Sequence, residues 1–108
     1  MAKRVLFVCS RNRWRSPTAE DVYRGTPGLE VASCGTSASA VRRASARLLE
    51  WADVVVCMEG KHRDRLREQF GRESLAGKEV VVLEVEDVYR RGDEGLVAEL
   101  REGLAGVL

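Results

Sequence analysis

Cys9 and Arg15 are the residues of this chain whose types and spacing are best suited to chemistry. Five residues separate them. A cysteine attacks as its thiolate, and that form is stabilised at a helix N-terminus and beside Arg or Lys. The Arg15 guanidinium is a planar, permanently charged fork that can bind two phosphate oxygens at once. Together the two side chains are suited to holding a phosphate group against a nucleophilic sulfur.

The sequence around this pair predicts a strand, a loop and the start of a helix. Residues 5–8 are four consecutive apolar residues, two of them β-branched, which predicts a buried strand. Ser16-Pro17 predicts a helix start, because Ser can cap the first turn and Pro at the first helical position loses no hydrogen bond. A loop that enters a helix N-terminus presents backbone N–H groups to an anion. The residues that we expect to bind phosphate are Ser10, Arg11, Asn12, Arg13, Trp14, Arg15 and Ser16.

A catalytic role for Cys9 competes with a plainer interpretation, in which it is a small buried residue and Arg15 is a surface charge. The combined strand, spacing, Arg and Ser-Pro favour catalysis. Cys9 would attack phosphorus to form a phosphocysteine, while Arg15 and the loop N–H groups hold the phosphate oxygens. The Ser16 hydroxyl could donate to the Cys9 sulfur and so favour its thiolate.

Residues 5–20 resemble the signature of the low-molecular-weight protein tyrosine phosphatase family. The shared features are a hydrophobic strand, a Cys, five residues with Asn in the middle, Arg-Ser-Pro, and a helix that contains Ala-Glu. The resemblance implies that Asn12 ties the loop together in a left-handed conformation, which Asn tolerates. One residue departs from the pattern: Arg11 stands where the family usually has Gly. Its Cβ either strains the loop or leaves the Arg11 side chain facing solvent.

Strand and helix patterns alternate along the rest of the chain, which predicts a parallel sheet with helices on both faces. We predict strands over residues 29–33, 53–58 and 80–83 (within the stretch 78–85), and helices over residues 16–24, 41–51, 59–70 and 96–107. We expect one α/β domain, residues 1–108, built as a three-layer αβα sandwich. Its four-stranded parallel sheet would have the order 2-1-3-4, with the phosphate loop after strand 1. Ligands bind at the carboxyl ends of such strands, where Cys9 lies.

A phosphatase of this kind needs a general acid to protonate the leaving oxygen. In the family that it resembles, the acid is an Asp followed by Pro on a loop near the C-terminus. By register with the last helix, Asp93 falls at this position, although Glu94 replaces the Pro. We therefore expect Asp93 to be the acid and keep Asp87 as the alternative. Asp93 is also a good candidate for the N-cap of that helix.

The sequence gives less reason to expect a reactive role for the remaining cysteines and the single histidine. Three widely spaced cysteines argue against a disulfide framework. Cys34 is a candidate resolving thiol for Cys9 but is more simply a small buried residue, and Cys57 is expected in the core. We expect His62 at the solvent edge of its helix. With one His and no Cys-x-x-Cys, we expect no metal site and no cofactor.

Charge and hydropathy exclude several classes of partner. The net charge is +1, and charged residues make up 32% of the chain, so its bulk charge does not indicate nucleic-acid binding. No apolar run approaches the length of a membrane span, and no signal peptide is evident. We expect a cytoplasmic protein that binds neither nucleic acid nor membrane.

Three functions fit these residues. The first is a cysteine-dependent phosphatase that releases inorganic phosphate from a phosphorylated protein, in particular phosphotyrosine, or from a small phosphate ester. The second is an arsenate reductase on the same fold, and the third is a non-catalytic phosphate or phosphopeptide binder. The resemblance implies aromatic walls for a phosphotyrosine ring, for which Trp14 and Tyr89 are the candidates.

Overall fold

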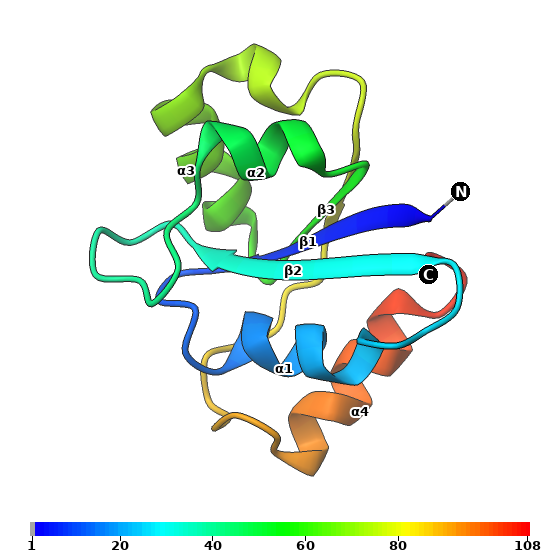
Figure 1. The fold of residues 1–108 in the computed structure, drawn as a ribbon. Coiled ribbons are helices and arrows are strands. Elements are labelled where there is room, and N and C mark those ends of the chain that lie inside the picture. Colours follow the sequence, from blue (N-terminus) through cyan, green and yellow to red (C-terminus); the bar gives the residue numbers. More distant parts are fainter. Residues whose placement is uncertain (1) are drawn as a thin grey trace.

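A computed structural model describes residues 2–108 as a three-layer αβα sandwich, as expected (Figure 1). All four strands are parallel and form one sheet in the order β2-β1-β3-β4. Helices α1 and α4 cover one face of this sheet, and α2 and α3 cover the other. The strands are β1 (Lys3–Cys9), β2 (Leu29–Gly35), β3 (Val54–Cys57) and β4 (Glu79–Val82). The helices are α1 (Arg15–Tyr23), α2 (Ala46–Trp51), α3 (Gly60–Phe70), the 3-10 turn η1 (Arg72–Leu75) and α4 (Glu94–Leu104).

Strand β1 lies in the middle of the molecule and divides its core in two. Its side chains alternate between the two faces of the sheet, as they do in any strand. Val5, Phe7 and Cys9 pack with the buried residues of α1 and α4. Leu6 and Val8 face the other way and pack with residues of α2, α3 and η1. Burial on both faces explains why this strand is a continuous apolar run.

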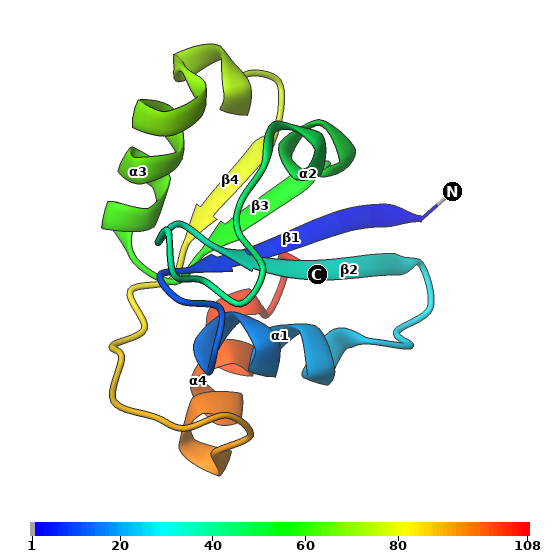
Figure 2. The same cartoon turned by 60° about the vertical axis from the view of Figure 1, so that its left-hand side comes forward.

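The strand register brings the loops that carry the candidate site residues to one edge of the sheet. Cys9 is paired with Gly35 of β2, and the preceding Val8 is paired with Cys57 of β3. The loops after β1, β2 and β4 therefore gather at the carboxyl edge of the sheet (Figure 2). Cys9 lies at this edge, as the sequence predicts.

The expected helix over residues 41–51 is wrong in its first half. Helix α2 begins only at Ala46, and the Ser45 side chain caps it by accepting a hydrogen bond from the Leu48 N–H. The preceding residues bond to β2 instead: the Gly35 N–H donates to the Arg42 carbonyl, and the Ala44 N–H donates to the Gly35 carbonyl. For the same reason β2 runs on to Gly35 and does not end at residue 33.

No helix within residues 2–108 has the length and apolar character that crossing a bilayer requires. Within the same residues, no three His, Cys, Asp or Glu side chains are grouped closely enough to hold a metal ion.

Candidate active site

The Cys9 sulfur lies at the carboxyl end of β1 with 3% of the residue exposed. The Asn12 N–H donates a hydrogen bond to Sγ at 3.2 Å. The Ser16 hydroxyl oxygen lies 3.0 Å from the same sulfur. A thiolate can only accept, so both groups would act as donors to it and stabilise its negative charge.

Ser16 does not cap its helix, so the predicted cap is wrong. Helix α1 begins at Arg15, its N-cap is Trp14, and no side chain caps it. Ser16 is therefore the second residue of the first turn, and its hydroxyl lies beside the Cys9 sulfur instead. Pro17 is the third helical residue, still within the first turn, where no intrahelical N–H bond is lost.

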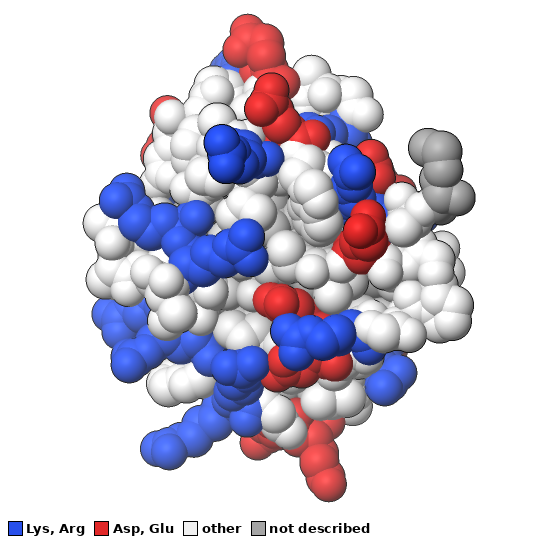
Figure 3. All heavy atoms as spheres, viewed as in Figure 1, with Lys and Arg blue, Asp and Glu red and all other residues white. Residues whose placement is uncertain are grey.

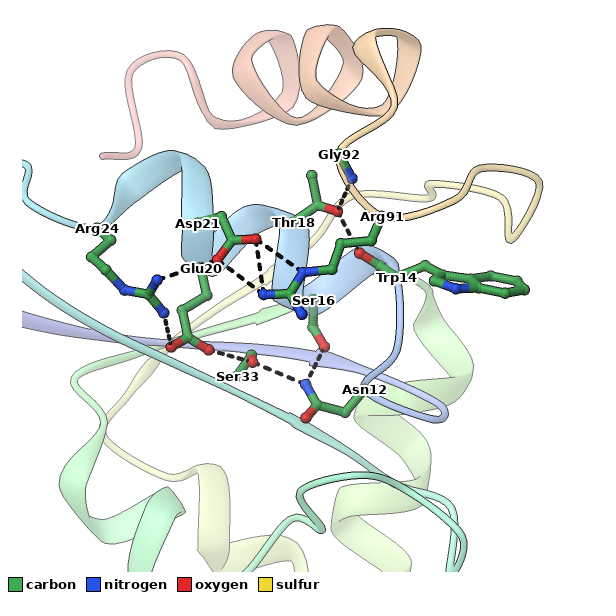
Figure 4. Close-up of polar contacts among 10 residues, drawn as sticks. All are labelled: Asn12, Trp14, Ser16, Thr18, Glu20, Asp21, Arg24, Ser33, Arg91 and Gly92. Atoms are coloured by element: carbon green, nitrogen blue, oxygen red, sulfur yellow. Dashed lines mark hydrogen bonds and ion pairs between the residues drawn. The ribbon is translucent and has the colours of Figure 1, made fainter.

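Asn12 holds the loop in shape from its centre (Figure 4). It is buried and has a left-handed backbone with φ 55°, which its short polar side chain makes accessible. Its amide Nδ2 donates to the Ser16 and Ser33 hydroxyls, each at 2.9 Å. The Ser33 hydroxyl in turn donates to the Glu20 carboxylate. These bonds connect the loop to α1 and β2.

Arg11 replaces the expected Gly without backbone strain. Among residues 2–108, the only non-glycine residues with positive φ are Asn12 and Glu84, so Arg11 lies outside the left-handed region. Its side chain is exposed at the mouth of the pocket. The Arg11 side chain therefore faces solvent, and the loop is not strained by its Cβ.

The backbone of the loop is free to bind an anion. Within the described chain, no acceptor bonds to the N–H groups of Arg11, Arg13, Trp14, Arg15 and Ser16. These groups precede or begin helix α1, where the helix dipole also favours negative charge. Successive free N–H groups at a helix N-terminus are typical of a phosphate site.

The Arg15 guanidinium is almost fully buried, with 2% of its side chain exposed. Its Nη1 donates to the Glu59 carboxylate at 2.5 Å and to the Val85 carbonyl at 2.9 Å. The bond from Arg15 lowers the pKa of the Glu59 carboxyl below its ordinary value, so Glu59 stays ionised and anchors the guanidinium.

The other edge of the Arg15 guanidinium, formed by Nε and Nη2, donates to no acceptor within residues 2–108. No fully buried polar side-chain atom of these residues lacks a partner. This edge must therefore reach the pocket that Arg15 lines. It offers the two parallel donors that bind phosphate in a bidentate manner.

The pocket over the loop has a volume of about 440 Å³ and contains one carboxylate, that of Asp87. The lining residues are Cys9, Ser10, Arg11, Arg13, Trp14, Arg15 and Asp87. Asp87 Oδ1 lies 3.6 Å from Arg15 Nε, and 53% of the Asp87 side chain is exposed. Asp93 is not among the lining residues. Its side chain accepts a bond from the Gly95 N–H at 2.7 Å and caps α4.

Hydrogen bonds connect the segment that carries Asp87, residues 83–93, to helix α1 (Figure 4). The Arg91 guanidinium donates from Nε and Nη2 to the two Asp21 carboxylate oxygens, at 3.0 and 3.1 Å. The Gly92 N–H donates to the Thr18 hydroxyl at 3.0 Å. The helix that begins at the phosphate loop therefore also positions the segment bearing Asp87.

His62 is fully buried, so its expected place at the solvent edge is wrong. Its Nδ1 accepts a bond from the Glu59 N–H at 3.0 Å, so the ring proton lies on Nε2 and is donated to the Ser10 hydroxyl at 2.9 Å. Burial and the nearby Arg15 charge lower the pKa of His62 to about 4. A neutral His62 thus supports the phosphate loop. The Glu-x-x-His spacing, a form of capping box, was the sequence signal for it.

Cys34 and Cys57 lie in the core on the face of the sheet opposite to Cys9. Burial raises the pKa of each thiol to about 12, so both are protonated at neutral pH. Their placement fits structural roles. Of the two aromatic candidates for a pocket wall, Trp14 lines the pocket and is 40% exposed. Tyr89 packs against the core instead.

No protein-family model matches the sequence, and no curated protein matches it. Solved structures do match. Wzb from Vibrio vulnificus, in complex with benzylphosphonate, is 22% identical, with a TM-score of 0.77 over 98% of this chain and 97% of its own. SP-PTP, a low molecular weight protein tyrosine phosphatase from Streptococcus pyogenes, is 15% identical, with a TM-score of 0.74 over 98% and 93% of the two chains. The YwlE arginine phosphatase from Geobacillus stearothermophilus is 23% identical, with a TM-score of 0.63 over 93% and 84%.

These likenesses extend over nearly the whole chain and agree with the observed strand order. At such identities they establish the fold of the chain alone. The chain has the fold of the low-molecular-weight protein tyrosine phosphatases.

Proposed function

We propose that this protein is a cysteine-dependent phosphatase that hydrolyses phosphate monoesters through a phosphocysteine on Cys9. One observation carries the proposal. The Cys9 sulfur, the Nε–Nη2 edge of Arg15 and the Asp87 carboxylate line the same pocket, over a loop in which the N–H groups of Arg11, Arg13, Trp14, Arg15 and Ser16 are unoccupied within the described chain. Nucleophile, phosphate ligand and acid are the three parts that such a reaction needs.

The first half of the reaction forms the phosphocysteine. The Cys9 thiolate attacks phosphorus while the bond from phosphorus to the leaving oxygen breaks. Arg15 and the loop N–H groups bind the three equatorial oxygens, whose charge they balance in the transition state. We propose Asp87 as the acid that protonates the leaving oxygen, because it lies beside Arg15 in the pocket whereas the Asp93 side chain is occupied as a helix cap.

The second half regenerates the enzyme. The Asp87 carboxylate, left without its proton, takes one from a water molecule as that water attacks the phosphocysteine. The sulfur–phosphorus bond breaks, inorganic phosphate leaves, and the Cys9 thiolate returns to its bonds with Asn12 and Ser16. Because a nucleophilic thiol must stay reduced, we place the protein in the cytoplasm.

Phosphotyrosine in proteins is the substrate that we propose. Trp14 lines the pocket and can pack against an aryl ring. The YwlE protein among the similar structures is an arginine phosphatase. In this chain, Arg11 and Arg13 line the pocket and would repel the guanidinium of a phosphorylated arginine. Charge therefore favours the neutral phenol as leaving group.

The two alternative functions, an arsenate reductase and a non-catalytic binder, would require different residues. An arsenate reductase with an internal thiol relay would need a second reactive cysteine near Cys9, but Cys34 and Cys57 are buried on the opposite face. Such a reductase would depend on an external thiol. A non-catalytic binder would use the same loop and Arg15 but would not need Asp87.

Hydrolysis of para-nitrophenyl phosphate and phenyl phosphate near pH 6, with a chelator present, tests the proposal. We expect wild-type turnover that is abolished in Cys9→Ser. Asp87→Asn should lower kcat by about 10²- to 10⁴-fold for phenyl phosphate, the range typical of a lost general acid. The loss should be smaller for para-nitrophenyl phosphate, since nitrophenolate leaves more easily without a proton.

Asp93→Asn is the matched control, because Asn caps a helix about as well as Asp. It should leave kcat for both esters close to the wild-type value. A sharp loss in Asp93→Asn but not in Asp87→Asn would reverse the assignment of the acid. If wild type binds phosphate but hydrolyses neither ester, the binder replaces the phosphatase, and thiol-dependent consumption of arsenate would point to the reductase.

A further inference from the structure

A second pocket, with a volume of about 200 Å³, adjoins the candidate active site. Its lining residues are Ser10, Arg11, Thr36, Ser37, Lys61, His62 and Arg65. We propose that this second pocket binds another anionic group of the same substrate. The preferred substrates are then phosphotyrosine peptides with an acidic or phosphorylated residue next to the phosphotyrosine. The inference rests on the proposed phosphatase function and names its substrate class.

The second pocket carries positive charge that nothing in it balances. Arg11, Lys61 and Arg65 line it, and no carboxylate does. Arg11 and Arg65 form no ion pair with any residue from 2 to 108. The Lys61 ammonium lies 3.6 Å from Glu59 Oε2, an oxygen that already accepts a bond from Arg15.

The surface around the phosphate loop also carries an excess of positive charge. Lys and Arg side chains gather on the side of the molecule where the loops after β1 and β2 lie, with few acidic groups among them (Figure 3). A peptide bound there meets cations on more than one side of its phosphotyrosine. A negative neighbour is therefore favoured over a neutral one.

The walls of the second pocket are held in place before any ligand arrives. The loop after β2 bonds to the backbone of the phosphate loop: the N–H groups of Thr36, Ser37 and Val41 donate to the carbonyls of residues 9, 10 and 11 at 2.9 to 3.0 Å. The Gln69 amide of α3 donates to the Thr36 carbonyl at 3.0 Å. Because this backbone is already fixed, no loop has to be ordered when an anion binds.

Ser10 and Arg11 connect the two pockets, since each lines both. The Ser10 hydroxyl accepts its bond from His62, so its own proton is free to be donated to an anion. A peptide anchored by its phosphotyrosine in the first pocket would thus bring an adjacent residue to the second. The size and donors of this pocket fit a carboxylate or a phosphate group.

A groove farther along α3 provides a natural comparison. It is lined by Arg67 and Arg72 but also by Asp64 and Glu68, so its charges cancel. Neither Arg67 nor Arg72 forms an ion pair within residues 2–108. Removing these two arginines lowers the net charge as much as removing Lys61 and Arg65, without changing the second pocket.

The test uses three phosphotyrosine peptides that differ only in the residues flanking the phosphotyrosine, which are Ala, Asp or phosphoserine. Wild type should have a higher kcat/KM for the Asp and phosphoserine peptides than for the Ala peptide, by about 5- to 10-fold at low salt, as expected for two exposed ion pairs. Added salt should reduce this preference. The double variant Lys61→Ala/Arg65→Ala should lose most of it, while Arg67→Ala/Arg72→Ala should keep it.

The outcomes separate this inference from the proposed function. No preference in wild type, or equal loss of preference in both double variants, overturns the second pocket even if the Ala peptide is hydrolysed well. Failure of wild type to hydrolyse any phosphate ester, para-nitrophenyl phosphate included, overturns the phosphatase and the inference with it. A preference for phosphoserine alone identifies a phosphate group as the second anion, and an equal preference for Asp identifies negative charge in general.

Discussion

Lowering the pH from 7 to 5 should destabilise this protein through one side chain, His62. It is the only histidine of the chain and is fully buried. Its Nδ1 accepts the Glu59 N–H, so a proton added there would face another donor and break the cap of α3. For this reason, and because burial disfavours charge, the folded protein should resist protonation of the ring.

The size of the effect follows from the two pKa values of the histidine. They are 6.5 for the ordinary side chain and about 4 in the folded protein. Below pH 6.5 the unfolded chain takes up a proton that the folded chain does not bind until the pH reaches about 4, so stability falls as the pH falls through this window. Linkage gives a loss of about 2 kcal/mol in the free energy of unfolding between pH 7 and pH 5. Most carboxyl groups remain ionised in this range, so the change in the free energy of unfolding comes mainly from His62.

Urea unfolding at the two pH values, for wild type and His62→Asn, measures this loss. Asn places an oxygen near the position of Nδ1 and does not titrate, so the variant should lose about 2 kcal/mol less stability than wild type between pH 7 and pH 5. An NMR titration reads the single imidazole directly and should give a pKa near 4. The reasoning is refuted if the ring titrates near 6.5, or if both proteins lose the same stability.

Three further predictions concern the supports of the candidate site. Glu59→Gln removes the charge that anchors the Arg15 guanidinium and should reduce kcat/KM for para-nitrophenyl phosphate about 10-fold in steady-state kinetics, less than the roughly 10²- to 10³-fold cost of losing a transition-state donor, because Arg15 itself remains. Gly35→Ala would push a methyl group into the backbone of the phosphate loop and should cost about 1–3 kcal/mol in thermal unfolding, with weaker stabilisation by added phosphate. Asp21→Asn breaks an exposed ion pair worth less than about 1 kcal/mol, yet it should lower kcat for phenyl phosphate more than for para-nitrophenyl phosphate, and the exchange Asp21→Arg/Arg91→Asp should restore the wild-type ratio.

The sheet could be predicted because its central strands are apolar without interruption. Residues 5–8 and 54–57 are buried on both faces of the sheet, so their hydrophobicity marks them regardless of which face each side chain meets. The loop and helix that follow β1 could be predicted equally well, because Cys9, Asn12 and Arg15 are close in sequence and belong to one local structure. Local spacing was enough for these elements.

The start of α2 could not be predicted from helical spacing alone. Val41 and Ala44 fit the apolar period of the helix, but the backbone there is used for bonds to Gly35 at the end of β2. Those bonds connect segments whose approach depends on the whole sheet. Tertiary pairing therefore prevailed over local periodicity, and the Ser45 cap was the better local signal.

The residues that other elements contribute to the candidate site could not be predicted from local spacing either. Glu59 and Asp87 are ordinary acidic residues in the sequence, and each reaches the candidate site only because β3 ends beside β1 and β4 ends beside β3. Both Asp87 and Asp93 follow β4, and the path of the segment between β4 and α4 brings Asp87 to 3.6 Å from Arg15 Nε, whereas Asp93 caps α4 although it lies nearer to the expected motif. A local motif can thus predict the candidate nucleophile and the loop that follows it. The proposed acid, Asp87, and the anchor of the arginine, Glu59, depend on how segments distant in the sequence meet, and the kinetic comparison of Asp87→Asn with Asp93→Asn tests the path of the segment after β4 as well as the chemistry.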